Sequence, residues 1–233
     1  MLYGVKINGI DTLAEYGLAL ASDYSIEAPT MKETRVDIPG ADGSINLSYA
    51  LTGRPTFNDR NISFSLFRST HDSDLVRLRS KLMSQFHGRE VQLVFPFDGS
   101  VYYSGILQIG NITNYNSSVI PVSMTASPYR IERVTSVEDW LWDPFDLNTG
   151  IARHYVDLPI ETPTEYFIVG SDMPVSPVFD VDGEGIGLYF HDEFYNLPEG
   201  RSSVIGLTLD PGMNSIIFTG EGTVSIEFRG GWL

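Results

Sequence analysis

Hydrophobic and polar residues alternate over short stretches along most of this chain, and turn residues separate the stretches. Residues 35–49 set two turn dipeptides between two such stretches. The dipeptides are Pro39-Gly40 and Asp42-Gly43, and the alternating apolar residues are Val36, Ile38, Ile45, Leu47 and Tyr49. A period of two is typical of half-buried strands, and glycine-containing pairs favour tight turns. The pattern therefore predicts a hairpin in a mainly β fold.

Other strands are predicted by the same reasoning. Residues 91–95 and 101–109 are rich in β-branched and aromatic residues and flank a Pro-Phe-Asp-Gly turn, which predicts a second hairpin. Residues 118–124 predict a strand that Pro121 would place at a sheet edge or a bulge. Six more strands are expected at residues 166–169, 178–181, 186–190, 204–209, 215–218 and 224–228. That density of strands predicts a β-sandwich in the second half of the chain.

Residues 72–87 break the β pattern. Apolar residues follow at intervals of three, four and four, which is helical spacing. They are Leu75, Leu78, Leu82 and Phe86. The segment predicts one amphipathic helix that covers a sheet and turns a basic face, with Arg77, Arg79 and Lys81, toward solvent.

Charge is distributed unevenly between the two halves. Residues 1–130 hold 11 Lys and Arg against 12 Asp and Glu, a net charge of −1, whereas residues 131–233 hold 4 against 18, a net charge of −14. Such a shift, next to linker-like punctuation at residues 127–130, predicts two domains, 1–130 and 131–233. A surface this acidic repels phosphate backbones, so nucleic-acid binding is not expected.

Composition excludes several classes of function. The chain has no cysteine, so disulfides, thiol catalysis and thiolate metal sites are absent. Its apolar runs are too short for a transmembrane helix, and its beginning lacks the pattern of a secretory signal, so we expect no membrane insertion and synthesis in the cytosol. Nucleophile elbows, metalloprotease helices and nucleotide-binding glycine loops are missing. We therefore expect no catalytic residue, no metal and no cofactor.

Two weaker patterns remain open. Residues 180–185 match the first half of a calcium loop, but His191 stands where the loop needs a bidentate carboxylate, so a turn between strands is favoured. Adjacent acids at 138–139 and 192–193 flank aromatic residues, namely Trp140, Trp142, Phe190, Phe194 and Tyr195. These aromatics could stack on sugar rings, and two acids could hydrolyse a glycan. Trp140 and Trp142 are interpreted instead as a hydrophobic clasp between domains.

The order of these segments resembles a known family. The segments are residues 3–9, residues 16–18, the hairpin at 35–49, the strand at 59–66, the single helix and the closing residues 224–233. In this order they resemble the distal tail proteins of long-tailed, non-contractile bacteriophages. The resemblance implies an amino-terminal β domain with a helix, six copies of which close into a ring, and a carboxy-terminal galectin-like sandwich.

The resemblance also implies a structural role in the virion, at the distal end of the tail. Its implied partners are further copies of the chain, the major tail tube protein, a tail-associated lysin or fibre hub, and receptor-binding or accessory baseplate proteins. On that view Arg77, Arg79, Lys81, Trp140 and Trp142 are candidate assembly contacts. A carbohydrate-binding module that contacts cell-wall glycans is the main alternative, and a glycan hydrolase is a third.

Overall fold

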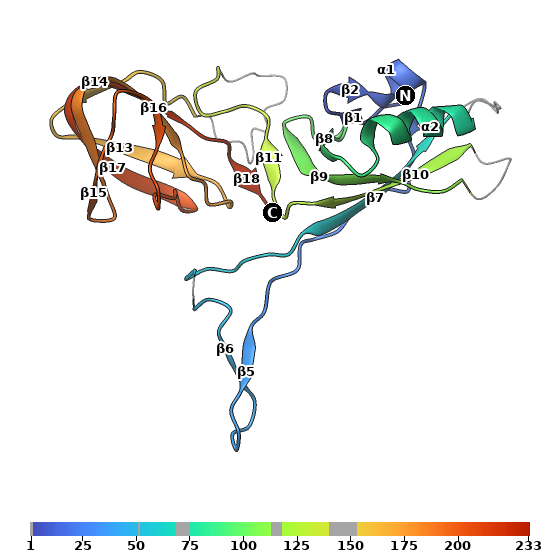
Figure 1. Ribbon diagram of the computed structural model, residues 1–233, viewed down its shortest axis with the longest axis horizontal. Coiled ribbons are helices and arrows are strands. Elements are labelled where there is room, and N and C mark those ends of the chain that lie inside the picture. Colours follow the sequence, from blue (N-terminus) through green and yellow to red (C-terminus); the bar gives the residue numbers. More distant parts are fainter. Residues whose placement is uncertain (1, 51, 69–74, 113–117, 140–152) are drawn as a thin grey trace. The chain divides into compact units, whose positions relative to one another are not determined.

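The computed structural model describes residues 2–50, 52–68, 75–112, 118–139 and 153–233. Within these ranges the chain is mainly β and forms two compact units (Figure 1). The first unit comprises Met1–Phe97 and Tyr103–Pro128, and the second comprises Asp98–Tyr102 and Tyr129–Leu233. The predicted mainly β fold class is confirmed.

An antiparallel sheet forms the body of the first unit. Its strands are β1 (Lys6–Ile7), β2 (Ile10–Asp11), β3 (Ala19–Leu20), β4 (Ser25–Ile26), β7 (Arg60–Phe67), β8 (Glu90–Val94), β9 (Val101–Ile109) and β10 (Val119–Ala126). They follow the order β2-β1-β8-β9-β10-β7-β3, and β4 also pairs with β7. The predicted hairpin of β8 and β9 is confirmed, with Glu90 opposite Ile106 and Leu93 opposite Tyr103.

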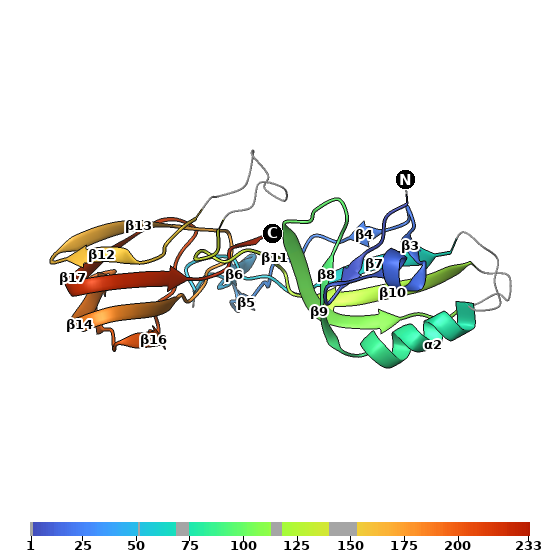
Figure 2. The same ribbon diagram turned by 90° about the horizontal axis from the view of Figure 1, so that it is seen from above.

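Helix α2 (Leu75–Phe86) covers this sheet, as the spacing of its apolar residues predicts (Figure 2). Leu75, Leu82 and Phe86 are buried in the core, and Leu78 packs against it. Residues 72–74 of the predicted helix lie outside the described residues. Gly88, with a positive φ of 70°, ends the segment and donates its amide to the carbonyl of Leu107 at 2.8 Å.

A second helix, α1 (Thr12–Tyr16), was not predicted. The Asp11 carboxylate accepts hydrogen bonds from the amides of Leu13 and Ala14 at its start. Gly17 ends it in the left-handed conformation, at φ 66°. Five residues are too few to show helical periodicity, but the Asp at the start and Gly at the end were visible signals.

Pro121 lies inside the sheet, so the prediction of an edge or a bulge is wrong. Its strand, β10, runs between β7 and β9, and Pro121 itself is opposite Ser65. The other side of Pro121 faces Gly110, the first residue after β9 ends, whose amide donates to the Pro121 carbonyl at 2.7 Å. A proline is tolerated here because the missing amide falls where the β9 ladder stops.

Strands β5 (Arg35–Asp37) and β6 (Ser44–Asn46) form a separate two-stranded sheet, which confirms the hairpin predicted at 35–49. They belong to a long ribbon of residues 27–59, here called the arm, that continues from β4 and returns to β7 (Figure 1).

The second unit contains the strands β11 (Arg130–Glu132), β12 (Leu158–Glu161), β13 (Thr164–Gly170), β14 (Val178–Phe190), β15 (Glu193–Asn196), β16 (Gly200–Ser203), β17 (Gly212–Glu227) and β18 (Gly231–Trp232). Strands β14 and β17 pair along most of their length (Figure 2). One half of this pair is flanked by β12 and β16, and the other half by β13 and β15.

A glycine-rich bend folds this strand pair into two layers. Gly183 and Gly222 face each other in register, both at φ 149°, and a Cβ on Gly222 would lie 2.2 Å from the Asp182 carbonyl oxygen. Only glycine permits backbones to approach so closely. The ring of Phe179 in one half meets the ring of Phe218 in the other at 6.3 Å, inside the buried core. The predicted sandwich is thereby confirmed.

Individual strands of the sandwich differ from the prediction. Residues 178–181 and 186–190 belong to one strand, as do residues 215–218 and most of 224–228. The segment 180–185 is thus the bend inside β14, not a turn between two strands. Residues 204–209 are not a strand, apart from a bridge between Leu209 and Val175.

Candidate functional site

The arm is a two-stranded ribbon with a regular register. Val36 stands opposite Ile45 in its outer part, and Met31 bridges to Phe57 nearer its base. The Asn58 amide donates to the Thr30 carbonyl at 2.8 Å, and the Leu47 amide donates to the Thr34 carbonyl at 2.8 Å. These bonds hold the ribbon together through its backbone.

The two faces of the arm differ in polarity. Val36, Ile45 and Leu47 share one face because they are paired or stand two residues apart, and they are 47%, 47% and 42% exposed. Ile38 and Tyr49, just beyond the paired residues, are exposed as well. Tyr49 was expected in the strand but lies in a turn, which the Ala50 amide closes on Leu47.

Polar side chains occupy the opposite face of the arm. Arg35 stands opposite Asn46, Asp37 stands opposite Ser44, and Arg35 forms an ion pair with Glu33 at 3.0 Å. The arm is therefore an amphipathic ribbon whose apolar face is open to solvent in a single copy. Exposed apolar rows of this kind mark interaction surfaces.

A ladder of aromatic rings leads from the core of the first unit to its surface. Buried Phe95 stacks on Phe97 at 5.1 Å, and Phe97 stacks on Tyr24 at 5.0 Å. Phe97 and Tyr24 are 54% and 44% exposed. Because Phe95 also meets Phe64 in the core at 5.7 Å, the two outer rings are held in place before any partner arrives.

The basic residues of α2 have different roles. Arg77 is exposed. Arg79 donates from Nε to the Gly110 carbonyl at 2.8 Å and from a terminal nitrogen to Asn111. Lys81 is 3.4 Å from Glu15 and 4.7 Å from the centre of the Tyr16 ring. Two of the three predicted contact residues are thus engaged inside the first unit.

Tyr16 is nearly buried beneath Lys81 and donates its hydroxyl to Gln85. Burial raises the pKa of Tyr16 above its ordinary value of 10.0, and the Lys81 charge opposes that shift. Trp140 and Trp142, the other predicted contacts, lie outside the described residues.

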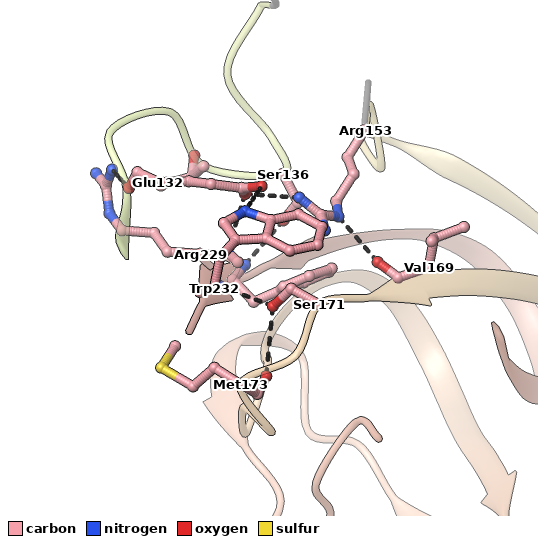
Figure 3. A network of polar contacts seen from close by, with 12 residues as sticks. Glu132, Ser136, Arg153, Val169, Ser171, Met173, Arg229 and Trp232 are labelled. Carbon is pink, nitrogen blue, oxygen red and sulfur yellow. Dashed lines mark hydrogen bonds and ion pairs between the residues drawn. The ribbon is translucent and has the colours of Figure 1, made fainter. Parts of the chain in front are cut away.

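A polar network in the second unit fastens the last residues of the chain (Figure 3). Its centre is the ion pair between Arg153 and Glu132 at 2.6 Å, in which the Arg153 side chain is only 4% exposed. Glu132 also accepts hydrogen bonds from the Gly230 amide at 3.0 Å and the Trp232 indole nitrogen at 3.2 Å. Arg153 donates to the Val169 carbonyl at 2.8 Å.

Two serines extend this network. Ser136 donates to the Ile226 carbonyl at 2.7 Å and accepts from the Phe228 amide at 2.8 Å. Ser171 accepts from the Gly231 amide at 2.7 Å. Sequence reasoning missed the network because its members are as much as 100 residues apart. The arrangement is that of a structural anchor, since Glu132 and Arg153 pair with each other and with the surrounding backbone, and only one terminal nitrogen of Arg153 is left without a hydrogen-bond partner.

The acids and aromatics considered for sugar chemistry gather partly at one hairpin of the second unit. His191 and Asp192 form the two-residue turn between β14 and β15, both with positive φ. Phe190, His191, Glu193, Tyr195, Gly206, Thr208 and Asp210 line a surface hollow there. The Tyr195 hydroxyl donates a hydrogen bond to Glu193, and this bond raises the pKa of Tyr195.

Other features bear on chemistry. No three His, Asp or Glu residues among those described lie close enough to hold a metal ion. In the same part of the chain, no helix is long and apolar enough to cross a membrane.

Comparison with known proteins gives a strong match to a solved structure. No protein-family model and no curated protein sequence matches the chain. The crystal structure of the SPP1 Dit protein (gp 19.1) superimposes with a TM-score of 0.64 at 13% sequence identity, and the match covers 100% of both chains. That protein is described as a paradigm of the hub adsorption apparatus in phages that infect Gram-positive bacteria. The chain has the Dit fold along its whole length, as the resemblance implied.

Proposed function

We propose that this protein is a structural hub at the distal end of a long, non-contractile phage tail. The amphipathic arm carries the proposal, because an apolar ribbon face that is open in one copy calls for burial in an assembly. Support also comes from the full-length likeness to a hub protein of a phage adsorption apparatus. The protein acts by geometry and has no enzymatic activity.

Six copies form the hub as a closed ring. Residues 1–130 make the ring, and residues 131–233, a galectin-like sandwich, project from it. One face of the ring docks on the tail tube protein and the other carries the tail-associated lysin or fibre hub. Receptor-binding or accessory baseplate proteins attach at the periphery. The protein is made in the cytoplasm of the host bacterium and resides in the virion at the tail tip.

The mass of the purified full-length protein, measured by light scattering, tests this function together with negative-stain images of the same sample. We expect particles of six subunits with an open centre. A protein that remains monomeric at every concentration, alone and with the tail tube protein added, would contradict the proposal. Point substitutions on the apolar and the polar face of the arm provide the matched samples.

A second candidate function is binding of cell-wall glycans. Tyr189 and Phe194 favour it, because their rings lie 4.8 Å apart on adjacent strands and both are exposed. Rings exposed in this way can stack on sugars. Sedimentation of the full-length protein with purified cell walls is the test, with Phe194→Ala as the variant expected to lose binding. Release of soluble sugar in that mixture would favour the hydrolase instead.

A further inference from the structure

We propose that the apolar face of the arm lies across the Tyr24–Phe97 ring pair of a neighbouring copy of the chain, in a head-to-tail arrangement. This inference rests on the proposed ring, and it names the two surfaces that meet at each seam. Its starting point is that both surfaces are exposed within a single copy. Neither can be covering the other in the same chain.

The arm needs a partner on physical grounds. A two-stranded ribbon is at best marginally stable in water, and a third layer against its apolar side stabilises it. Residues 27–59 number 33, and about half of them face the apolar side because side chains alternate along each strand. The arm therefore supplies a large part of the roughly 20–30 residues that one side of a standard interface contributes.

The ring pair suits such a ribbon. Aromatic residues fixed before binding lose little freedom on association and are frequent centres of binding energy. Phe97 is fixed by Phe95 beneath it, and Tyr24 is fixed by Phe97. Along the described part of the first unit, these two are the exposed rings that stack directly on one another above a buried ring. They offer a flat apolar surface to Val36, Ile45 and Leu47.

Charge directs the arm to the first unit of its neighbour. The tip of the arm, residues 36–45, contains Asp37 and Asp42 and no basic residue. Residues 131–233 carry a net charge of −14 and would repel this tip. Residues 1–26 and 60–130 together hold 8 basic and 7 acidic residues, so they present no such barrier.

Because the two surfaces differ, the contact is head-to-tail. A contact between identical patches would stop at a dimer, whereas a contact between two different patches continues from copy to copy until the rotation closes. Each copy then gives its arm to one neighbour and its ring pair to the other. The same geometry that makes the seam also makes the ring.

Cross-linking tests the contact cleanly, because the chain has no cysteine of its own. Full-length Val36→Cys and Ser25→Cys variants, one of them carrying an affinity tag, are mixed at high concentration and treated with a short bismaleimide. Ser25 is exposed and follows Tyr24 in the chain, so this cysteine leaves both rings in place. We expect a heterodimer band from the mixture and none from either variant alone. Asp37→Cys, adjacent in the strand but on the opposite face, is the matched control and should link at least tenfold less.

Assembly variants give an independent readout. Val36→Ser with Ile45→Ser should lower the assembled fraction at least tenfold at a fixed protein concentration, as should Phe97→Ala. Arg35→Ser with Asp37→Ser, on the polar face, should leave it unchanged. Circular dichroism checks that all of them fold, because Phe97 also stacks on the buried ring of Phe95, whereas the substituted arm positions are exposed.

The outcomes separate this inference from the proposed function. A ring by light scattering without cross-links between Val36→Cys and Ser25→Cys would overturn the arm contact and leave the hub intact. Linked dimers from Val36→Cys alone would show arm-to-arm pairing and also overturn the inference. A chain that neither assembles nor cross-links would overturn both.

Discussion

Arg79 of α2 donates from Nε to the carbonyl oxygen of Gly110 at 2.8 Å, on the side where the adjacent strand holds Pro121. Any other residue at position 121 would offer an amide hydrogen toward that oxygen, since the Gly110 amide already bonds the Pro121 carbonyl. The helix thus supplies the donor that the proline lacks. Arg79, a candidate assembly contact in the sequence, therefore also has a structural role within the first unit.

Replacing Arg79 tests whether it supplies the donor that Pro121 lacks. We expect Arg79→Ala to lower the free energy of unfolding by about 1–3 kcal/mol, because the partly buried Gly110 carbonyl loses its charged donor. Arg77→Ala, on the exposed side of the same helix, should change it by less than about 0.5 kcal/mol. Urea denaturation measures both. In a Pro121→Ala background the cost of Arg79→Ala should shrink, since the new amide can serve the same oxygen; an equal cost in both backgrounds would contradict the account.

The buried pair of Glu132 and Arg153 gives a second prediction. Glu132→Ala leaves the Arg153 charge buried without its partner and should cost about 3–5 kcal/mol of unfolding free energy. The pair of Arg201 and Glu227, in which the Arg201 side chain is 60% exposed, is the control, and Arg201→Ala should cost no more than about 1 kcal/mol. Chemical denaturation monitored by tryptophan fluorescence follows both, because Trp232 bonds Glu132 directly. Equal losses in the two variants would argue against an anchoring role.

The glycine-rich bend of the sandwich gives a third prediction. Gly222→Ala would place a methyl group 2.2 Å from a backbone oxygen, so we expect a loss of more than about 3 kcal/mol or failure to fold. Gly212→Ala adds a methyl group in open space at φ 90° and isolates the cost of backbone strain, about 1–3 kcal/mol. Thermal unfolding compares them. The idea fails if Gly222→Ala is the milder change.

Tyr16 predicts how stability depends on alkaline pH. Its pKa is raised by burial in the folded state, so the folded chain holds the phenol proton where the unfolded chain has released it. Stability from this group is complete below pH 10.0 and declines as the pH rises through the folded pKa. We expect Tyr16→Phe to lose less stability above pH 10 than the native chain in denaturation curves. Parallel curves for the two proteins would exclude Tyr16 as the source.

Sequence patterns predicted the local features of the fold and missed the long-range ones. The hairpin at 35–49 and helix α2 follow from turn residues and spacing alone, because their determinants are neighbours in the chain. The long strand β14 was divided in two at Gly183–Gly185, since glycine marks a bend as readily as an end. The amphipathic arm was visible as alternation at Val36 and Ile45, but its exposure was not, because alternation does not tell which face is covered.

The Glu132–Arg153 anchor was beyond sequence reasoning for a different reason. Glu132 lies in β11, Arg153 lies before β12, and Trp232 lies in the closing strand β18. Only the folded chain brings these three residues together. A buried arginine also looks like any other arginine in the sequence. Aromatic stacking of Phe97 on Phe95 was likewise hidden, although the two residues are nearly adjacent.

The bend shared by β14 and β17 has a mechanical consequence. Two paired strands pass from one layer of the sandwich to the other, with one register shift between Glu184 and Gly187. Force applied to one layer is therefore transmitted to the other through the covalent backbone and through a ladder of hydrogen bonds loaded in shear. The layers cannot be peeled apart without first breaking that ladder, so the second unit should yield to tension as a single piece.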